Sequence, residues 1–183
     1  MTDSFKSGIS PYQLKIDPAK TTVVEAQSAL KPHVKDPGVI CPCCHQLVRL
    51  SEKEITPGMA YVAILLHRHF LEDSGWLHVA SYLKNLAVLG SEVKGGGWSK
   101  LQLWDLIEEK PEEKGKVHKP GFYRMTEKGH QFVKGEIKIH TVALIYNGKL
   151  LGFGKGETTI QKRLGKEFSY EDLMSGKLGT FSV

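Results

Sequence analysis

The chain has 183 residues, and its 25 Lys and Arg against 20 Asp and Glu give a formal net charge of +5. Hydrophobic residues at 40% and charged residues at 25% are ordinary for a soluble globular protein. No apolar run approaches the roughly 20 residues that span a bilayer, and the first residues lack the pattern of a secretory signal, so we expect a cytoplasmic protein that does not enter a membrane.

Residues 1–36 are predicted to form a peripheral N-terminal arm. Pro11, Pro18 and Pro32 divide this stretch into pieces that are too short for an independent domain. Residues 22–30 predict one brief helix within it.

Residues 37–56 contain all three cysteines, in the run Cys41-Pro42-Cys43-Cys44. Two thiolates separated by two residues can bind one tetrahedral metal ion from a tight turn, so Cys41 and Cys44 predict a zinc-binding knuckle. A closed zinc site needs four ligands, and Cys43 or His45 could add a third. A second subunit could instead supply another cysteine pair, or histidines from elsewhere could complete the set: His67, His69, His118 or His130. The alternative is a metal-free turn whose cysteines are small buried hydrophobic residues.

Two helices are predicted over residues 51–86. Ser51 and Glu54 have the spacing of a capping box, and Thr56 followed by Pro57 marks a second helix start. The helix is expected to continue to about Asp73, with His67 and His69 at its surface or boundary. Residues 73–75 predict a turn, and residues 76–86 predict the second helix. An apolar face of the first helix is expected from residues at helical spacing: Met59, Val62, Leu65, Leu66 and Phe70.

Residues 95–135 predict a helix, a strand, a loop, a returning strand and another helix. Leu101, Trp104 and Ile107 recur at a three-residue step, which places them on one buried face. Residues 108–119 are mostly charged and predict an exposed tip, and residues 121–125 return as an aromatic-rich strand. A hydroxyl at Thr126 then fits the start of a new helix.

The segments LWDLIEE and GFYRMTEKGHQFV resemble the recognition helix, wing and following helix of winged-helix transcription regulators of the MarR and PadR kind. The resemblance covers residues 57–135. It implies an α+β fold with a winged-helix core, and a DNA-binding regulator that acts as a homodimer. The link over residues 87–97 is longer than the tight turn of those regulators. The whole chain is also similar to uncharacterised phage and prophage proteins with a CPxC motif, which implies no activity.

A recognition helix that starts at Trp98 would contact DNA through its N-terminal, outward residues. On this interpretation the contacts are those of the helix and of the basic second half of the wing: Trp98, Ser99, Lys100, Gln102, Lys116, Lys119 and Arg124. The alternative is that Lys100 and Gln102 form a solvated face and that Trp98 belongs to the core. Glutamates in residues 108–113 nearly cancel the charge of the wing.

Residues 136–183 predict a β-hairpin followed by short helices. Asn147-Gly148 between apolar runs is a strong hairpin signal, because both residues tolerate positive φ. Thr158 or Thr159, and then Ser169, are expected to cap the two helices. The segment also holds a set of basic residues that could form a polyanion or partner surface: Lys149, Lys155, Lys162, Arg163 and Lys166.

No residue pattern in the chain predicts an enzyme. The sequence lacks a nucleophile elbow, and its paired glutamates lie in a predicted polar tip, which disfavours acid–base catalysis. The resemblance to winged-helix regulators makes DNA binding the leading hypothesis. The rival hypothesis is a phage-type accessory protein that binds and modulates a host protein and uses the winged helix as a scaffold.

Overall fold

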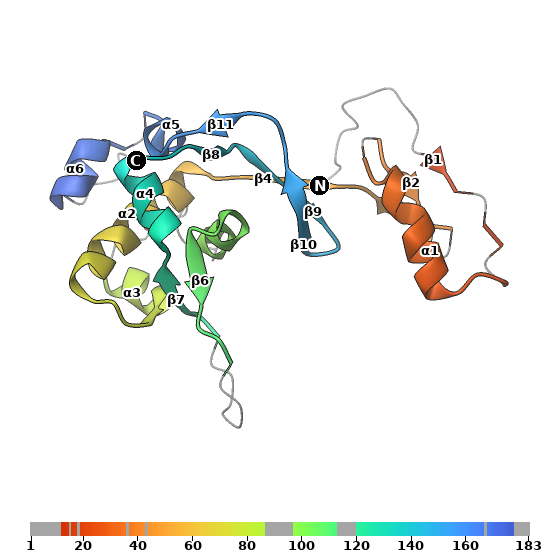
Figure 1. Ribbon diagram of the computed structural model, residues 1–183, viewed down its shortest axis with the longest axis horizontal. Coiled ribbons are helices and arrows are strands. Elements are labelled where there is room, and N and C mark those ends of the chain that lie inside the picture. The colour runs from red at the N-terminus through yellow and green to blue at the C-terminus, as the bar shows by residue number, and fades with distance from the viewer. Residues whose placement is uncertain are drawn as a thin grey trace. The chain divides into compact units, whose positions relative to one another are not determined.

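The computed structural model has mixed helices and strands, which confirms the α+β class (Figure 1). The chain divides into two compact units: residues 1–53 with 144–152 form unit 1, and residues 54–143 with 153–183 form unit 2. The tip of the predicted C-terminal hairpin thus groups with the N-terminal segment. No described helix is long and apolar enough to cross a membrane. The structure describes residues 12–14, 16–17, 19–35, 37–42, 44–86, 97–112, 120–166 and 168–177.

The N-terminal part of unit 1 combines one α-helix with short strands. The predicted helix is confirmed, and its N-cap Thr22 forms a reciprocal capping box with Glu25. Strand β1 pairs in parallel with β2, and β2 pairs antiparallel with β3. The elements are β1 (Tyr12–Gln13), α1 (Val23–Leu30), η1 (Lys31–His33), β2 (Val39–Ile40) and β3 (Leu47–Val48).

A second sheet of unit 1 has the strand order β10-β9-β4. It confirms the predicted hairpin, since Asn147 and Gly148 both have positive φ, of 49° and 72°, between β9 and β10. The capping box predicted at Ser51 and Glu54 is wrong, because these residues begin and end a strand. The strands are β4 (Ser51–Glu54), β9 (Val142–Tyr146) and β10 (Lys149–Phe153).

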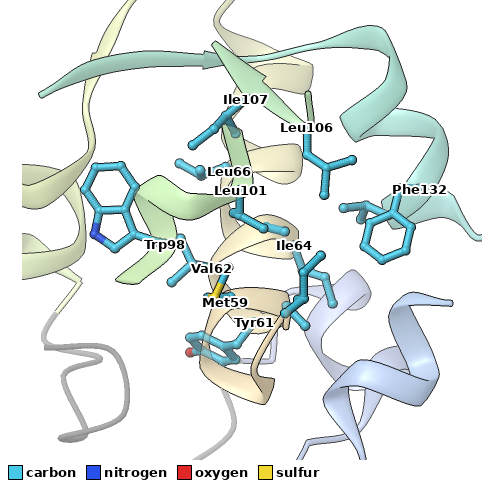
Figure 2. Packing of buried hydrophobic residues seen from close by; sticks show 14 of the residues in the cluster. Met59, Tyr61, Val62, Ile64, Leu66, Trp98, Leu101, Leu106, Ile107 and Phe132 are labelled. Atoms are coloured by element: carbon cyan, nitrogen blue, oxygen red, sulfur yellow. The ribbon is translucent and has the colours of Figure 1, made fainter. Parts of the chain in front are cut away.

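Helix α2 (Pro57–Glu72) is the centre of unit 2. Its start is the predicted one, because the hydroxyl of Thr56 accepts a hydrogen bond from the backbone N–H of Met59 at 3.2 Å. Every residue from Gly58 to His67 is buried, so other elements cover the helix on all sides. Figure 2 shows side chains of α2 such as Ile64 packed with Leu101 and Phe132 from later elements.

A three-stranded antiparallel sheet packs beside α2, with the order β5-β7-β6. The predicted return of the chain is confirmed, since Tyr123 pairs with Glu109 on one side and Leu77 on the other. The helix predicted from Trp76 is corrected: a strand comes first, and His78 caps a helix that begins at Val79. The elements are β5 (Leu77–His78), α3 (Val79–Asn85), η2 (Gly97–Trp104), β6 (Ile107–Glu109), β7 (Phe122–Met125) and α4 (Glu127–Lys134).

The rest of unit 2 closes the core with one short strand pair and two short helices. Thr159 and Ser169 accept N-cap hydrogen bonds, as predicted. The hydroxyl of Tyr170 donates to the backbone carbonyl of Val133 at 2.8 Å, which joins the last helix to α4. These elements are β8 (Ile139–His140), β11 (Glu157–Thr158), α5 (Ile160–Leu164) and α6 (Tyr170–Ser175).

Candidate nucleic-acid interface and cysteine turn

The helix η2 is a 3₁₀ helix, in which residues three apart lie directly above one another. Trp98, Leu101 and Trp104 form one such row, and their exposed fractions are 8%, 0% and 1%. The three-residue step in the sequence therefore reflects a 3₁₀ period, while Ile107 is buried from the following strand. The Trp98 ring meets the Tyr123 ring edge-on at 5.1 Å between centroids. Trp98 is a core residue, which argues against its predicted contact with DNA.

The other predicted contacts on η2 face away from this buried row to different degrees. Lys100 is exposed and has no ion-pair partner in the described part of the chain. Ser99 and Gln102 are half-buried. Ser99 also has an interaction within the protein, so Lys100 is the residue of η2 that is best placed to meet a polyanion.

The β6 and β7 strands form a ribbon whose charged side chains pair with each other. Nε of Arg124 donates to Oε1 of Glu108, which lies directly opposite in the register. The guanidinium carbon of Arg124 also lies 4.6 Å from the centre of the Trp76 ring. Arg124 is thus already held by an acid and an aromatic ring. Lys116 and Lys119 lie outside the described residues.

The start of α4 is fixed against the end of η2 by a set of short contacts. Asp105 has a positive φ of 58°, and its carbonyl accepts a hydrogen bond from the hydroxyl of Thr126 at 2.6 Å. The same hydroxyl oxygen accepts from the backbone N–H of Gly129 at 3.0 Å. A Cβ at Gly129 would lie 2.1 Å from the carbonyl oxygen of Leu106. This junction sets the position of the ribbon relative to the helices of unit 2.

A pair of histidines, His67 of α2 and His130 of α4, joins the two helices. Their Nδ1 atoms are 2.8 Å apart, so one ring donates its N–H to the lone pair of the other. Burial lowers the pKa of His67 to about 4, helped by the charges of His130 and Lys134. Burial also lowers the pKa of His130, partly opposed by Glu127. Both rings are therefore neutral near pH 7.

The burial of His67 was missed by sequence reasoning, which placed it at the surface or boundary. It is 2% exposed. A signal was present, because His67 lies three and seven residues after the buried Ile64 and Ala60 and so continues their helical stripe. The prediction gave more weight to the polarity of histidine than to its position on the helix.

An open hollow of about 330 Å³ lies next to this histidine pair. Its lining mixes apolar groups with both signs of charge and includes Phe70, Met125, Arg124, Glu127 and His130. The mixed charge does not select one class of ligand.

The cysteine turn connects β2 to β3. The backbone N–H of Cys41 donates to the carbonyl of Gln46, and that of His45 donates to the carbonyl of Cys41, both at 2.9 Å. His45 has a positive φ of 58°, which reverses the chain. Cys41 is half-buried and Cys44 is exposed, so Cys44 is not the small buried hydrophobic residue of the metal-free alternative. Cys43 lies outside the described residues, and within them no three potential metal ligands gather.

Arg163 does not belong to the basic surface that was predicted for the C-terminal segment. The side chain of Arg163 is 14% exposed and donates to Glu54 at 2.8 Å and to the hydroxyl of Thr158 at 3.0 Å. Arg163 therefore stabilises unit 2 from within. The remaining predicted members are exposed: Lys149, Lys155, Lys162 and Lys166.

Comparison with known proteins assigns no family to the chain. No protein-family model, no curated protein and no solved structure matches it. The geometry of the described residues is therefore the basis for the proposals that follow.

Proposed function

We propose that the protein binds double-stranded DNA through a winged-helix domain formed by residues 57–135, as a homodimeric transcriptional regulator. One observation carries the proposal: the order α2, β5, α3, η2, β6, β7 combined with the sheet order β5-β7-β6. This arrangement puts a two-stranded ribbon directly after a helix that can serve as the recognition helix.

The packing of η2 supports the same proposal. Its buried row of Trp98, Leu101 and Trp104 holds the helix rigidly against the core, and the indole N–H of Trp104 donates to the carbonyl of His140 at 2.7 Å. Lys100 then provides a cation for a phosphate, and the amide of Gln102 is a group that can pair with adenine. A rigid helix keeps both groups in one register on the duplex.

The ribbon is expected to make a modest electrostatic contribution. Arg124 is paired with Glu108, so its charge is partly neutralised before any ligand arrives. The predicted tip also contains Lys114, Lys116 and Lys119, which lie outside the described residues. Since each phosphate contact contributes close to one unit of salt slope, we expect a shallow dependence of affinity on salt.

The test is the affinity for random duplex DNA measured across a range of salt concentrations. Lys100→Glu should weaken binding and reduce the slope of log K against log salt by about 1, and the double variant Lys100→Glu, Lys116→Glu should reduce it further. Lys138→Glu is a matched control, because it makes the same charge change at an exposed residue. Lys138 directly precedes β8, and Figure 1 shows β8 away from the ribbon of β6 and β7.

Equal effects of Lys100→Glu and Lys138→Glu would contradict the proposed interface, because both variants alter the net charge equally. Wild-type protein that shows no salt-dependent retention on DNA would contradict DNA binding itself.

The pairing of Arg124 with Glu108 favours a second candidate function. A ribbon whose charges cancel suits a protein surface better than a phosphate backbone, so the chain could instead be an accessory factor that binds a host protein. Purification from the native host distinguishes the two, because the DNA-binding proposal expects bound nucleic acid and the rival expects a bound protein.

A further inference from the structure

The turn between β2 and β3 has the features of half a tetrahedral metal site. The strands pair up to Ile40 and Leu47, and two backbone hydrogen bonds then close the turn around Cys41. The left-handed conformation at His45 lets the chain reverse within these few residues. Cys41 and Cys44 therefore stand on one tight turn, which is the arrangement from which two thiolates bind a single zinc ion.

The described residues provide this half-site with no further ligands. A structural zinc site is closed by four ligands, and no three potential ligands gather in the ranges that the structure describes. Two of the histidines that could have completed the site, His67 and His130, are hydrogen-bonded to each other in unit 2. An identical pair of cysteines on a second chain would supply the two missing thiolates.

We propose that Cys41 and Cys44 of two chains bind one zinc ion, so that the metal links two copies of the protein through their cysteine turns. The exposure of Cys44 leaves its sulfur accessible to a second turn. Four thiols lose four protons when they bind the ion as thiolates, and no oxidant or reductant takes part. Because each chain contributes the same two residues, the link has two-fold symmetry.

The small core of unit 1 gives this link a physical purpose. The hydrophobic residues that unit 1 buries within its described part are Ala26, Leu30, Val34 and Val39. Such a core contributes little stability, and small domains of this kind usually depend on a metal, a disulfide or a partner. A shared zinc ion would add both a metal and a partner at one point.

The first experiment measures metal content and molecular mass of the full chain, purified with a phosphine reductant and without chelators. The expected result is one zinc per two chains and the mass of a dimer. Removal of the metal with a chelator should yield monomers, and zinc alone should restore the dimer. A dimer that survives chelation, or one zinc per monomeric chain, would overturn the shared site.

A second measurement identifies the ligands by replacing zinc with Co²⁺. Four thiolates around Co²⁺ give intense visible bands and strong sulfur-to-metal charge transfer, and both weaken when histidine or water replaces sulfur. The proposal expects the spectrum of a tetrahedral site with four thiolates. A spectrum with mixed nitrogen and sulfur ligands would contradict it.

Serine variants assign the thiolates. Cys41→Ser and Cys44→Ser should each abolish zinc retention and dimer formation, whereas Cys43→Ser, an identical change between them, should keep both. Loss of zinc in Cys43→Ser would overturn the assignment. The Lys100→Glu variant should retain metal and dimer, so a failure of the DNA-binding proposal leaves this one intact and is distinguishable from it.

Discussion

The two units of the molecule are stabilised in different ways. Unit 2 has a continuous hydrophobic core that extends from Ile55 to Leu173 and surrounds α2. Unit 1 buries a few aliphatic side chains, and its described structure relies on a capping box, a tight turn and short strand pairs. The comparison shows that unit 2 is held by burial of apolar surface, whereas unit 1 depends mainly on hydrogen bonds of its cap, turn and strand pairs and, on our proposal, on a metal ion.

The largest effect is expected from Gly129→Ala in α4. The new Cβ would lie 2.1 Å from the carbonyl oxygen of Leu106 and 2.8 Å from Cγ of Met125. Backbone at the junction must move, so we expect unit 2 to lose about 3 kcal/mol or more of unfolding free energy. Chemical denaturation followed by tryptophan fluorescence measures this loss, because all three tryptophans lie in unit 2.

Gly97→Ala is the matched control for Gly129→Ala. A Cβ at Gly97 meets no atom within 4 Å, so its effect should stay within about 0.5 kcal/mol. Comparable losses in the two variants would mean that the close approach of α4 to Leu106 does not hold unit 2 together.

The next effect is a loss of stability of unit 2 in acid. The folded-state pKa of His67 lies near 4, below its ordinary value of 6.5, so the unfolded chain binds more protons between these values. Stability is complete above about pH 6.5 and falls as the pH drops towards 4, by about 3 kcal/mol. The lowered pKa of His130 adds to the loss in the same direction. Denaturation curves between pH 7 and 4 measure it.

The double variant His67→Leu, His130→Leu should flatten this pH dependence. His140→Gln, which changes an exposed histidine of the same unit, should keep the full slope. An unchanged slope in the double variant would exclude the histidine pair as its source.

The N-cap threonines of α1 in unit 1 and α4 in unit 2 allow the stabilities of the two units to be compared at equivalent positions. The hydroxyl of Thr126 caps α4 and also donates to the carbonyl of Asp105, whereas the hydroxyl of Thr22 caps α1 and bonds only with Glu25 among the described residues. Thr126→Ala should lower the stability of unit 2 by about 1 to 2 kcal/mol. Thr22→Ala should remove about 1 kcal/mol and act on α1 alone.

Amide hydrogen exchange followed along the sequence checks both cap variants. In Thr22→Ala, faster exchange should be confined to residues 23–33, because little core holds that helix. In Thr126→Ala, exchange should rise across unit 2 as one cooperative unit. Exchange that rises throughout the chain in Thr22→Ala would show that the two units are not independently stabilised.

The smallest effect is expected from Lys100→Glu. Lys100 is exposed and makes no ion pair with another described residue, so the unfolding free energy should change by less than about 0.5 kcal/mol. Thermal unfolding checks this. A larger change would mean that loss of DNA affinity in this variant reports on folding instead of on a contact.

Much of the local structure could be predicted because it depends on neighbouring residues. The caps at Thr56, Thr126 and Ser169 and the turn at Asn147-Gly148 follow from side-chain oxygens and positive φ within a few residues. Ser51 had the same capping signal, but the prediction of a helix start there was wrong, because β4 pairs with β9. Tertiary pairing of this kind leaves no trace in a short window of sequence.

The candidate sites were less predictable because they depend on which partner a side chain finds. Arg124 resembled a DNA contact, but Glu108 lies opposite to it in the register. Arg163 resembled part of a basic surface, but it is paired with Glu54, which is more than a hundred residues away in the sequence. His67 was expected at the surface or boundary until α4 brought His130 against it. In each case one long-range neighbour changed the role of the residue.

The polypeptide passes between the two units at three points, after residues 53, 143 and 152. A truncation that begins at residue 54 would therefore leave the β9–β10 hairpin attached to unit 2 while deleting most of β4, its neighbour in the sheet. Without β4, the hairpin would expose the edge of β9. Leu150 and Leu151 of β10 are already exposed, and an open strand edge beside exposed apolar residues favours aggregation. A fragment made to contain unit 2 alone therefore has to omit residues 1–53 and also replace residues 144–152 with a short turn.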